Sequence, residues 1–221
     1  MRLAALYSGG KDSTLAMYLA MQMGHEVACL VSIRPTTADS MMFHTPNLDV
    51  VPLMAEATGV RLVTATGSDT EDGDLDALKE ALRDLDLDGV VTGAAWSDYQ
   101  WSRIDAVCDD LGLTVLSPMW RKDQDMMARE LLDAGIVAVV VGCYAEGLDR
   151  SWLGRTLDAA AFDDLRRLRD RYGISIMGEG GEYESMTLDS PMHARPLEIV
   201  SAETVWTRNS GLLQVTGARL G

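Results

Sequence analysis

The sequence predicts an α/β protein in which a doubly wound, five-stranded parallel sheet is followed by a smaller C-terminal α+β domain. Two observations carry this prediction. In the first half, short apolar runs alternate with segments of helical periodicity, which is typical of βαβ units. After Pro118 the pattern changes, and two runs near the C-terminus alternate apolar and polar residues as antiparallel strands do. We therefore predict domains at 1–118 and 119–221.

The first half should build the parallel sheet. Gly24, Gly59 and Gly112 each stand where a predicted helix should end, and right-handed crossovers would place helices on both faces. The expected strands are Leu3–Tyr7, Val27–Ile33, Arg61–Ala65, Gly89–Thr92 and Thr114–Leu116. The expected helices are Ser13–Met23, Leu48–Thr58, Leu75–Leu85 and Tyr99–Leu111.

The second half should be a mixed domain. Between its helices and its last two strands lies a segment rich in glycine and glutamate, residues 178–185, for which we predict no strand. The expected elements are helices at Asp123–Ala134 and Ala159–Tyr172, an apolar strand at Ile136–Cys143, and antiparallel strands at Leu197–Trp206 and Leu212–Arg219.

The net charge of −15 argues against a nucleic-acid partner, because an acidic surface repels phosphates unless basic residues gather in one place. The one dense basic cluster alternates with aspartates in a predicted helix, which favours a salt-bridged surface over an RNA site. This cluster is Arg166, Arg167, Arg169 and Arg171.

Membrane association is not expected either. No apolar run approaches the roughly 18–20 residues of a membrane span, and no N-terminal segment has the pattern of a signal peptide. The three cysteines, Cys29, Cys108 and Cys143, are far apart and form no C-x-x-C pair, so we expect buried thiols and no zinc site. These features predict a cytoplasmic protein.

The hexamer at residues 8–13, Ser-Gly-Gly-Lys-Asp-Ser, carries the strongest functional signal. It follows a predicted strand and opens a helix, so its glycines let successive backbone N–H groups approach an anion. We expect Ser13 to cap that helix. The spacing excludes a Walker A motif, which has four residues between its glycines and Ser or Thr after its lysine.

Two further loops should meet this hexamer at the same sheet edge. His44 stands beside Phe43 and could contact a nucleotide, although a packed loop histidine explains it equally well; Asn47 is expected to cap the next helix. In residues 93–103, small residues permit a ligand to approach closely. Helix capping explains Ser97 and Asp98 there, but not the nearby cluster of Trp96, Tyr99 and Trp101.

The segment 178–185 holds Glu179, Glu182 and Glu184 among three glycines. A solvated acidic loop is the ordinary meaning of such a run. However, ordered glycines cost conformational entropy, and three carboxylates held close repel one another. A cation between them, either Mg²⁺ or a positively charged substrate, would relieve that repulsion.

The hexamer resembles the pyrophosphate loop of the ATP pyrophosphatases, which split ATP between its α and β phosphates. The chain as a whole resembles the diphthine–ammonia ligase family of that superfamily. This resemblance covers nearly the whole sequence, and it rests on residues 8–13, 42–45, 93–103, 147–154 and 178–185, where Glu-Gly-Gly-Glu-Tyr-Glu-Ser selects the family.

The resemblance implies an adenine nucleotide α-hydrolase-like sheet, with ATP and Mg²⁺ as cofactors. It also implies that ammonium amidates diphthine on translation elongation factor two through an acyl-adenylate, giving diphthamide, AMP and pyrophosphate. Some eukaryotic relatives carry extra C-terminal domains that this chain lacks, so we expect an archaeal-type enzyme.

The resemblance implies residue roles as well. Ser8, Gly9, Gly10, Lys11, Asp12, Ser13 and His44 would bind the nucleotide. Lys11 would neutralise developing charge, and Asp12 would organise the loop or Mg²⁺. The three glutamates would attract ammonium and accept its proton. Substrate contacts are expected from Trp96, Ser97, Asp98, Tyr99, Arg103 and Tyr183. Two or more aromatic rings would cage the substrate's trimethylammonium group, from among Trp96, Tyr99, Trp101, Trp120, Trp152 and Tyr183.

Other functions stay open at this point. Transfer-RNA thiolation and lysidine formation use the same loop, but the chain has neither paired cysteines nor a basic surface. NAD and GMP synthetases share the loop and lack the Glu-Gly-Gly-Glu segment. A nucleotide sensor would bind ATP without releasing pyrophosphate. The sequence decides neither which glutamate is the base nor whether the chain forms a homodimer.

Overall fold

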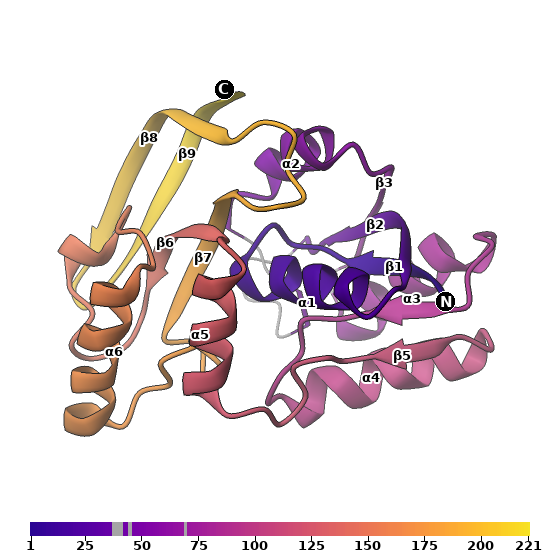
Figure 1. The fold of residues 1–221 in the computed structure, drawn as a ribbon, viewed down its shortest axis with the longest axis horizontal. Coiled ribbons are helices and arrows are strands. Elements are labelled where there is room, and N and C mark those ends of the chain that lie inside the picture. Colours follow the sequence, from indigo (N-terminus) through magenta and orange to yellow (C-terminus); the bar gives the residue numbers. More distant parts are fainter. Residues whose placement is uncertain (37–41, 44–45, 69) are drawn as a thin grey trace.

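The structure is a computed structural model that describes residues 1–36, 42–43, 46–68 and 70–221. A five-stranded parallel sheet in the order β3-β2-β1-β4-β5 occupies the first half of the chain. A four-stranded antiparallel sheet in the order β7-β6-β9-β8 occupies the second half (Figure 1). The predicted fold class, a parallel α/β sheet with a separate C-terminal sheet, is confirmed.

The parallel sheet is built from β1 (Arg2–Leu6), β2 (Glu26–Arg34), β3 (Leu62–Thr66), β4 (Gly89–Val91) and β5 (Thr114–Leu116). Its helices are α1 (Lys11–Gln22), the 3₁₀ turn η1 (Leu48–Val50), α2 (Val51–Thr58), α3 (Glu71–Arg83) and α4 (Asp98–Asp110). The second half contains α5 (Gln124–Asp133), β6 (Val137–Cys143), η2 (Arg150–Trp152), α6 (Ala159–Tyr172), β7 (Tyr183–Asp189), β8 (Leu197–Thr207) and β9 (Ser210–Leu220).

Helices cover both faces of the parallel sheet. Because successive residues of a strand point to opposite faces, β1 contributes to two separate cores. Leu3 and Ala5 belong to the cluster that contains residues of α1 and α2, whereas Ala4 and Leu6 belong to the cluster with α3 and α4. The strand order reverses between β1 and β4, so the helices that follow these two strands pack on opposite faces of the sheet.

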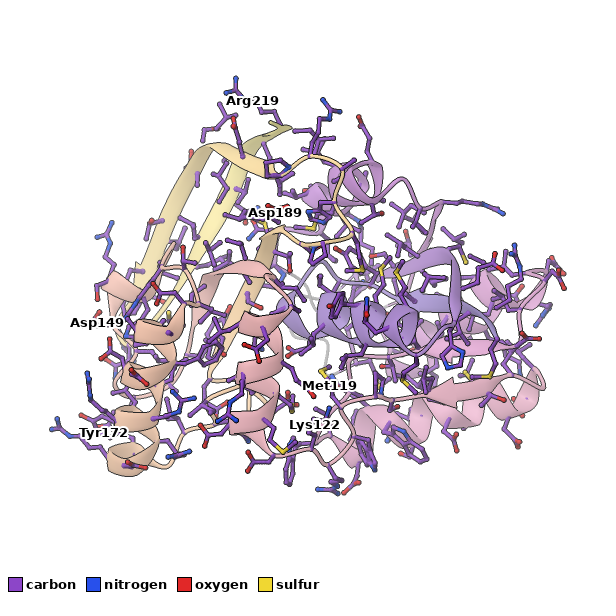
Figure 2. All side chains as sticks on the ribbon, viewed as in Figure 1. Met119, Lys122, Asp149, Tyr172, Asp189 and Arg219 are labelled. Carbon is purple, nitrogen blue, oxygen red and sulfur yellow. The ribbon has the colours of Figure 1, made fainter. Side chains whose placement is uncertain are left out.

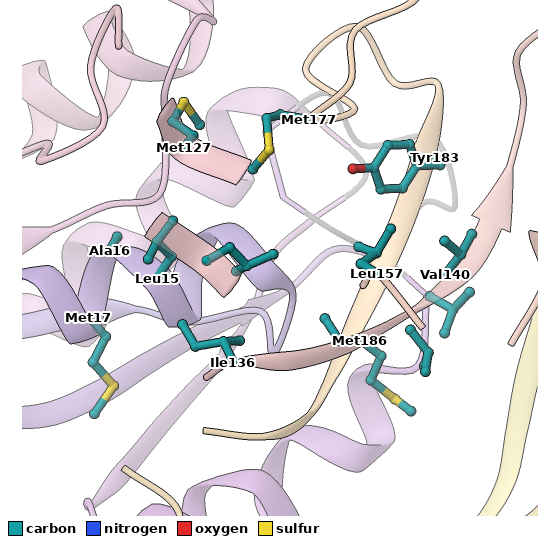
Figure 3. Packing of buried hydrophobic residues seen from close by; sticks show 14 of the residues in the cluster. Leu15, Ala16, Met17, Met127, Ile136, Val140, Leu157, Met177, Tyr183 and Met186 are labelled. Atoms are coloured by element: carbon teal, nitrogen blue, oxygen red, sulfur yellow. The ribbon is translucent and has the colours of Figure 1, made fainter. Parts of the chain in front are cut away.

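The core on the α1 face continues into the second half of the chain. Figure 3 shows Leu15 and Met17 of α1 in one cluster with Met127 of α5, Val140 of β6 and Met186 of β7. All five side chains are at most 2% exposed. This shared core fixes β7, and with it the segment 178–185, against the start of α1.

Three local predictions were wrong. Ser13 does not cap α1, because the helix begins at Lys11 with Gly10 as the N-cap residue and no side-chain cap. Asn47 makes no cap bond either; its amide group bonds the backbone of Leu213 and Val215 in β9. The strand β7, within a stretch where we predicted none, pairs with β6 along its whole length.

The predicted salt-bridged face of α6 and the predicted burial of the cysteines are confirmed. On α6, Arg166 and Arg169 both pair with Asp125 of α5, and Arg167 pairs with Asp164. The three cysteines are free and buried. Figure 2 shows Lys122 on the connection that leads into α5, where its ammonium donates to both carboxylate oxygens of Glu130 at 2.7 and 2.8 Å. Within the described ranges, no helix is long and apolar enough to cross a membrane.

Candidate active site

A cavity of about 280 Å³ lies beyond the carboxyl ends of β1 and β4, the two strands at which the strand order reverses. Ligands of open α/β sheets bind at such a switch point. The loop after β1 and residues 92–94 after β4 line one part of this cavity, and residues of the segment 178–185 line another. Both halves of the chain therefore contribute to a single site.

The structure brings together about half of the residues that the sequence singled out. Those lining the cavity are Ser8, Gly10, Lys11, Asp12, Ser13, Glu179, Tyr183 and Glu184. Among the described residues, those that belong to the predicted set and do not line it are Gly9, Glu182, Trp96, Ser97, Asp98, Tyr99 and Arg103. His44 lies outside the described residues, so its predicted role stays a prediction.

The two glycines of the loop serve different purposes. Gly9 has a φ of +78°, and a Cβ built on it would lie 2.3 Å from the sulfur of Met54, so the chain path and α2 both require glycine there. Gly10 has a φ of −76°, which any residue can adopt, and a Cβ on it would meet no atom closer than 3.4 Å. A Cβ at Gly10 would therefore make only ordinary contacts with Ser185 and Ser8, on the wall of the cavity.

Two hydroxyl groups link the ends of the loop. The backbone N–H groups of Ser8 and Gly10 donate to Ser13 Oγ at 3.4 Å and to Ser8 Oγ at 3.3 Å, respectively. The two serine hydroxyls lie 3.3 Å apart, and Ser13 Oγ also donates to the carbonyl of Gly10 at 3.0 Å. Both serines line the cavity, so these polar atoms are at its wall.

Lys11 is a buried cation beside this loop. Its side chain is only 3% exposed, and Nζ donates to Asp12 Oδ2 at 2.8 Å and to the carbonyl of Met177 at 2.6 Å. Burial alone lowers the pKa of Lys11, but the charges of Asp12, Tyr183 and Glu179 outweigh burial and raise that pKa above its usual value. The ammonium therefore stays charged inside the protein.

The second carboxylate oxygen of Asp12 is left without a partner. Asp12 Oδ1 is buried and accepts no hydrogen bond from the part of the chain that the structure describes. A buried oxygen of this kind needs a donor or a cation, and Mg²⁺ prefers oxygen ligands. No group of three His, Cys, Asp or Glu side chains that could hold a metal occurs among the described residues. Asp12 therefore suits an ion that takes its other ligands from phosphates and water.

Glu179 is a carboxyl group held close to neutrality. Burial, and after it the negative charge of Asp12, raises its pKa to about 8. Lys11 and a hydrogen bond from the backbone N–H of Trp96 oppose this shift without cancelling it. A carboxyl with a pKa near physiological pH can take up and release a proton during a reaction.

Glu182 is used differently from Glu179. Its Oε1 accepts the backbone N–H of Ser175, and its Oε2 accepts that of Gly180, both at 2.8 Å. Both carboxylate oxygens of Glu182 therefore stabilise the turn of the acidic segment. Glu184 lies on β7 opposite Gly142 and lines the cavity. The three glutamates therefore do not form one equivalent set.

The aromatic residues are dispersed over several environments. Trp101 and Trp120 stack on each other with ring centroids 5.3 Å apart, and Trp152 is 5% exposed in the core. Trp96 is 38% exposed, and its indole N–H donates to the carbonyl of Lys122. Of the six rings proposed for a cage, Tyr183 lines the described cavity.

Several lining residues were not predicted individually as site residues. Ser32, Thr92 and Gln100 supply polar groups, and Ser185 completes the acidic segment. An apolar part of the lining comes from Val31, Ile33, Met42, Phe43 and Ile104. Ser32 and Thr92 could have been predicted, because both lie at the carboxyl ends of predicted strands, where ligands of parallel sheets bind.

Gly93 is small for a different reason than expected. A Cβ on this residue would lie 2.9 Å from the backbone carbon of Asp12 and the nitrogen of Ser13. The loop after β4 therefore packs directly against the first turn of α1. Ser97 does cap α4, since its side chain accepts the N–H of Gln100.

Known proteins resemble this chain over most of its length. The diphthamide synthase N-terminal domain profile matches residues 1–115, and the C-terminal domain profile matches residues 123–220. A diphthine–ammonia ligase from Danio rerio is 36% identical, with 93% of this chain and 89% of the relative covered. The enzyme of that name from Homo sapiens is 34% identical, with 93% and 85% covered. The one from Schizosaccharomyces pombe is also 34% identical, with 93% and 37% covered.

A glycine loop at the switch point of a parallel sheet, with a buried lysine beside it, defines an α/β protein built to hold a nucleotide. The two matched domains and the relatives then identify the family within this class of proteins. The chain belongs to the diphthamide synthase family. The domain boundary near residue 118 stays a prediction.

Proposed function

We propose that this chain is an AMP-forming ligase that uses ATP and ammonium to convert diphthine on translation elongation factor two into diphthamide. The family and the names of its relatives support this function. The observation that carries the proposal is that one cavity is lined by both the glycine loop and Glu179. An anion site and a proton acceptor therefore face the same space.

The first half of the reaction concerns the leaving group. A carboxylate is a poor electrophile, because its leaving group would be oxide. Transfer of AMP onto it creates a mixed anhydride and releases pyrophosphate. Gly10, with the hydroxyls of Ser8 and Ser13, would hold the departing phosphates, while Lys11 neutralises the charge that develops on them.

A magnesium ion fits the same place. Asp12 would bind it through Oδ1, the buried oxygen without a partner. When bound, Mg²⁺ would neutralise phosphate charge and orient the phosphates. Asp12 then connects the ion to Lys11, because its other oxygen accepts the Lys11 ammonium.

The second half of the reaction needs a base. Ammonium must lose a proton before its nitrogen can attack the acyl carbonyl. Ionised Glu179 would take that proton, and AMP would leave with the electrons of the anhydride bond. A pKa of about 8 suits this transfer, because a base works best when its pKa lies near the working pH. Glu184 would assist by attracting the cation, and Glu182 would keep the loop in shape.

The apolar lining from β2 and α4 suits the adenine ring, and His44 keeps its proposed place in the nucleotide site. We propose that the protein substrate approaches from the side of Trp96, the most exposed of the candidate rings. Ser97, Asp98, Tyr99 and Arg103 follow Trp96 on the same segment and would extend that contact, while Tyr183 lies deeper in the cavity.

The test is a pyrophosphate-release assay with ATP, Mg²⁺, ammonium and diphthine-bearing elongation factor two. We expect release that depends on both ammonium and the elongation factor, together with AMP and diphthamide in equal amounts. Release that ignores the elongation factor would contradict the proposal. A nucleotide sensor would bind ATP and release nothing.

A further inference from the structure

Ser185 belongs to the C-terminal half of the chain, yet its hydroxyl lies at the glycine loop. Its Oγ accepts the backbone N–H of Lys11 at 3.1 Å, across a separation of 174 residues in sequence. The residue is 4% exposed and lines the cavity. Ser185 is thus a buried polar side chain placed at the predicted phosphate site by another sheet.

The hydrogen of the Ser185 hydroxyl can be donated to a ligand. A serine hydroxyl can donate once and accept twice. The Lys11 N–H uses an acceptor position, and within the described part of the chain no acceptor is recorded for the Ser185 hydrogen. A buried hydroxyl gains stability when its hydrogen finds an acceptor, and the space that Ser185 faces is the cavity.

The position of Ser185 is held by its neighbours on β7. The N–H of Thr187 donates to the carbonyl of Gly9 at 2.8 Å, and the hydroxyls of Thr187 and Thr14 lie 3.0 Å apart. Thr187 and Thr14 are both fully buried. Because Thr187, two residues after Ser185 on β7, is bonded to Gly9 and lies beside Thr14 of α1, the strand holds the Ser185 hydroxyl in place before any ligand arrives.

We propose that the Ser185 hydroxyl donates a hydrogen bond to a phosphate oxygen of the bound nucleotide, which would make the C-terminal half a direct part of the phosphate site. The Lys11 N–H polarises the hydroxyl and makes it a better donor. This inference rests on the proposed function, because it assigns the phosphates of ATP to this cavity. It gives Ser185 a binding role separate from that of the neighbouring glutamates.

The test compares the affinity of the full chain for ATP and for adenosine by isothermal titration calorimetry. Ser185→Ala should weaken ATP binding roughly tenfold, because it removes a hydrogen bond to a charged group. Adenosine carries no phosphate, so its affinity should stay unchanged. Ser185→Thr keeps the hydroxyl and should bind ATP within about twofold of the parent chain.

Ser190→Ala is the matched control. Ser190 follows β7, is 5% exposed, and accepts one backbone N–H, that of Met192, at 3.3 Å, but it does not belong to the described cavity lining. This variant should leave both affinities unchanged. A melting curve for each variant shows whether it is folded. If Ser185→Ala does not fold, Ser185→Cys replaces it, since a thiol has a similar shape and donates weakly.

Three results would overturn the inference. ATP affinity equal to that of the parent chain would mean that Ser185 does not contact phosphate. Tighter ATP binding would mean that the freed Lys11 N–H binds the phosphate itself. An equal loss for ATP and adenosine would mean that Ser185 only supports the fold. If the parent chain binds ATP but releases no pyrophosphate with the elongation factor, the proposed function fails, while the comparison of affinities still decides the role of Ser185.

Discussion

The glycine loop and the acidic segment meet at one cavity, but the protein treats their charged groups in opposite ways. Lys11 is buried among negative groups, so its pKa is raised and the ammonium keeps its charge. Glu179 is partly buried and lies near Asp12; its loss of solvent and, after that, the charge of Asp12 raise its pKa to about 8 and favour the neutral carboxyl. One region is therefore suited to binding an anion and the other to exchanging a proton.

The acidic segment itself contains a second contrast. Glu179 and Glu182 are the same residue type, three positions apart. Glu182 satisfies both carboxylate oxygens with backbone N–H groups, whereas Glu179 lines the cavity with a perturbed pKa. The contrast teaches that identical side chains in one motif can be divided between chemistry and structure. Substitutions at these residues should separate the two roles.

The largest effect is expected from Lys11→Met, which keeps the length of the side chain and removes its charge. Pyrophosphate release should fall about 1,000-fold, because the developing phosphate charge loses its buried partner. Lys79→Met is the control, since Lys79 makes an exposed ion pair with Asp110 and should keep full activity. Equal rates for the two variants would show that Lys11 holds no phosphate.

Glu179→Gln should slow amidation about 100-fold at neutral pH, because the proton acceptor is lost. ATP affinity should stay within a few-fold of the parent chain. In the parent chain, the rate should rise with pH up to about 8, as Glu179 ionises. A pH profile of single-turnover diphthamide formation checks both statements. An unchanged profile in the variant would assign the base elsewhere.

The same variant should change the pH dependence of stability. The pKa of Glu179 is raised on folding from its usual value of 4.5 to about 8. Its stabilising contribution to the free energy of unfolding is therefore complete below pH 4.5 and is lost as the pH rises through about 8. Glu179→Gln removes this loss. Melting temperatures of the two proteins should therefore diverge in favour of the variant between pH 5 and pH 9. A constant difference would mean that Glu179 ionises freely in the folded state.

Gly9→Ala and Gly10→Ala should separate folding from binding within one loop. Gly9→Ala places a side chain on a left-handed backbone and against the sulfur of Met54, so it should lower the free energy of unfolding by about 1–3 kcal/mol or more. Gly10→Ala makes only ordinary contacts with Ser185 and Ser8, so the fold should persist while ATP affinity drops about tenfold. Denaturant melts and calorimetry measure the pair. The reverse pattern would contradict the geometry of the loop.

Glu182→Gln should act on stability more than on chemistry. A glutamine amide has one oxygen, so one of the two backbone N–H groups loses its acceptor at a cost of about 1–3 kcal/mol. The rate of amidation in folded protein should fall less than tenfold. A rate as low as that of Glu179→Gln would remove the distinction between the two glutamates.

Trp96→Ala should have the smallest effect. If the protein substrate contacts this exposed ring, its KM should rise several-fold while ATP affinity stays constant. Trp101→Ala is the contrasting variant, because Trp101 stacks on Trp120 and should chiefly lower the melting temperature. Steady-state kinetics with diphthine-bearing elongation factor distinguish the two results.

Much of this fold follows from periodicity, and β7 shows where periodicity fails. Most strands of the parallel sheet were predictable because they are short apolar runs between helical segments. In β7, Ser185 and Thr187 are buried polar residues, since they bond the glycine loop and not an apolar layer. The sequence of β7 therefore lacks the apolar pattern that would predict a strand, and Ser185 could not be assigned to one.

The sequence likewise predicted only part of the site. The glycine hexamer and the acidic segment could be found from residue types and spacing. The division of labour between Glu179 and Glu182 could not, because it depends on burial and on backbone N–H groups brought together by folding. For the same reason, the sequence could suggest aromatic rings for a cage but could not show that Trp101 and Trp120 already stack on each other.

The most direct measurement is a crystal structure with Mg²⁺ and an ATP analogue that cannot be split between its α and β phosphates. Our account predicts the β and γ phosphates against Gly10, Ser8 and Ser13, with Lys11 and a metal-bound Asp12 beside them. Phosphates bound elsewhere, with residues 8–13 free of ligand, would contradict it.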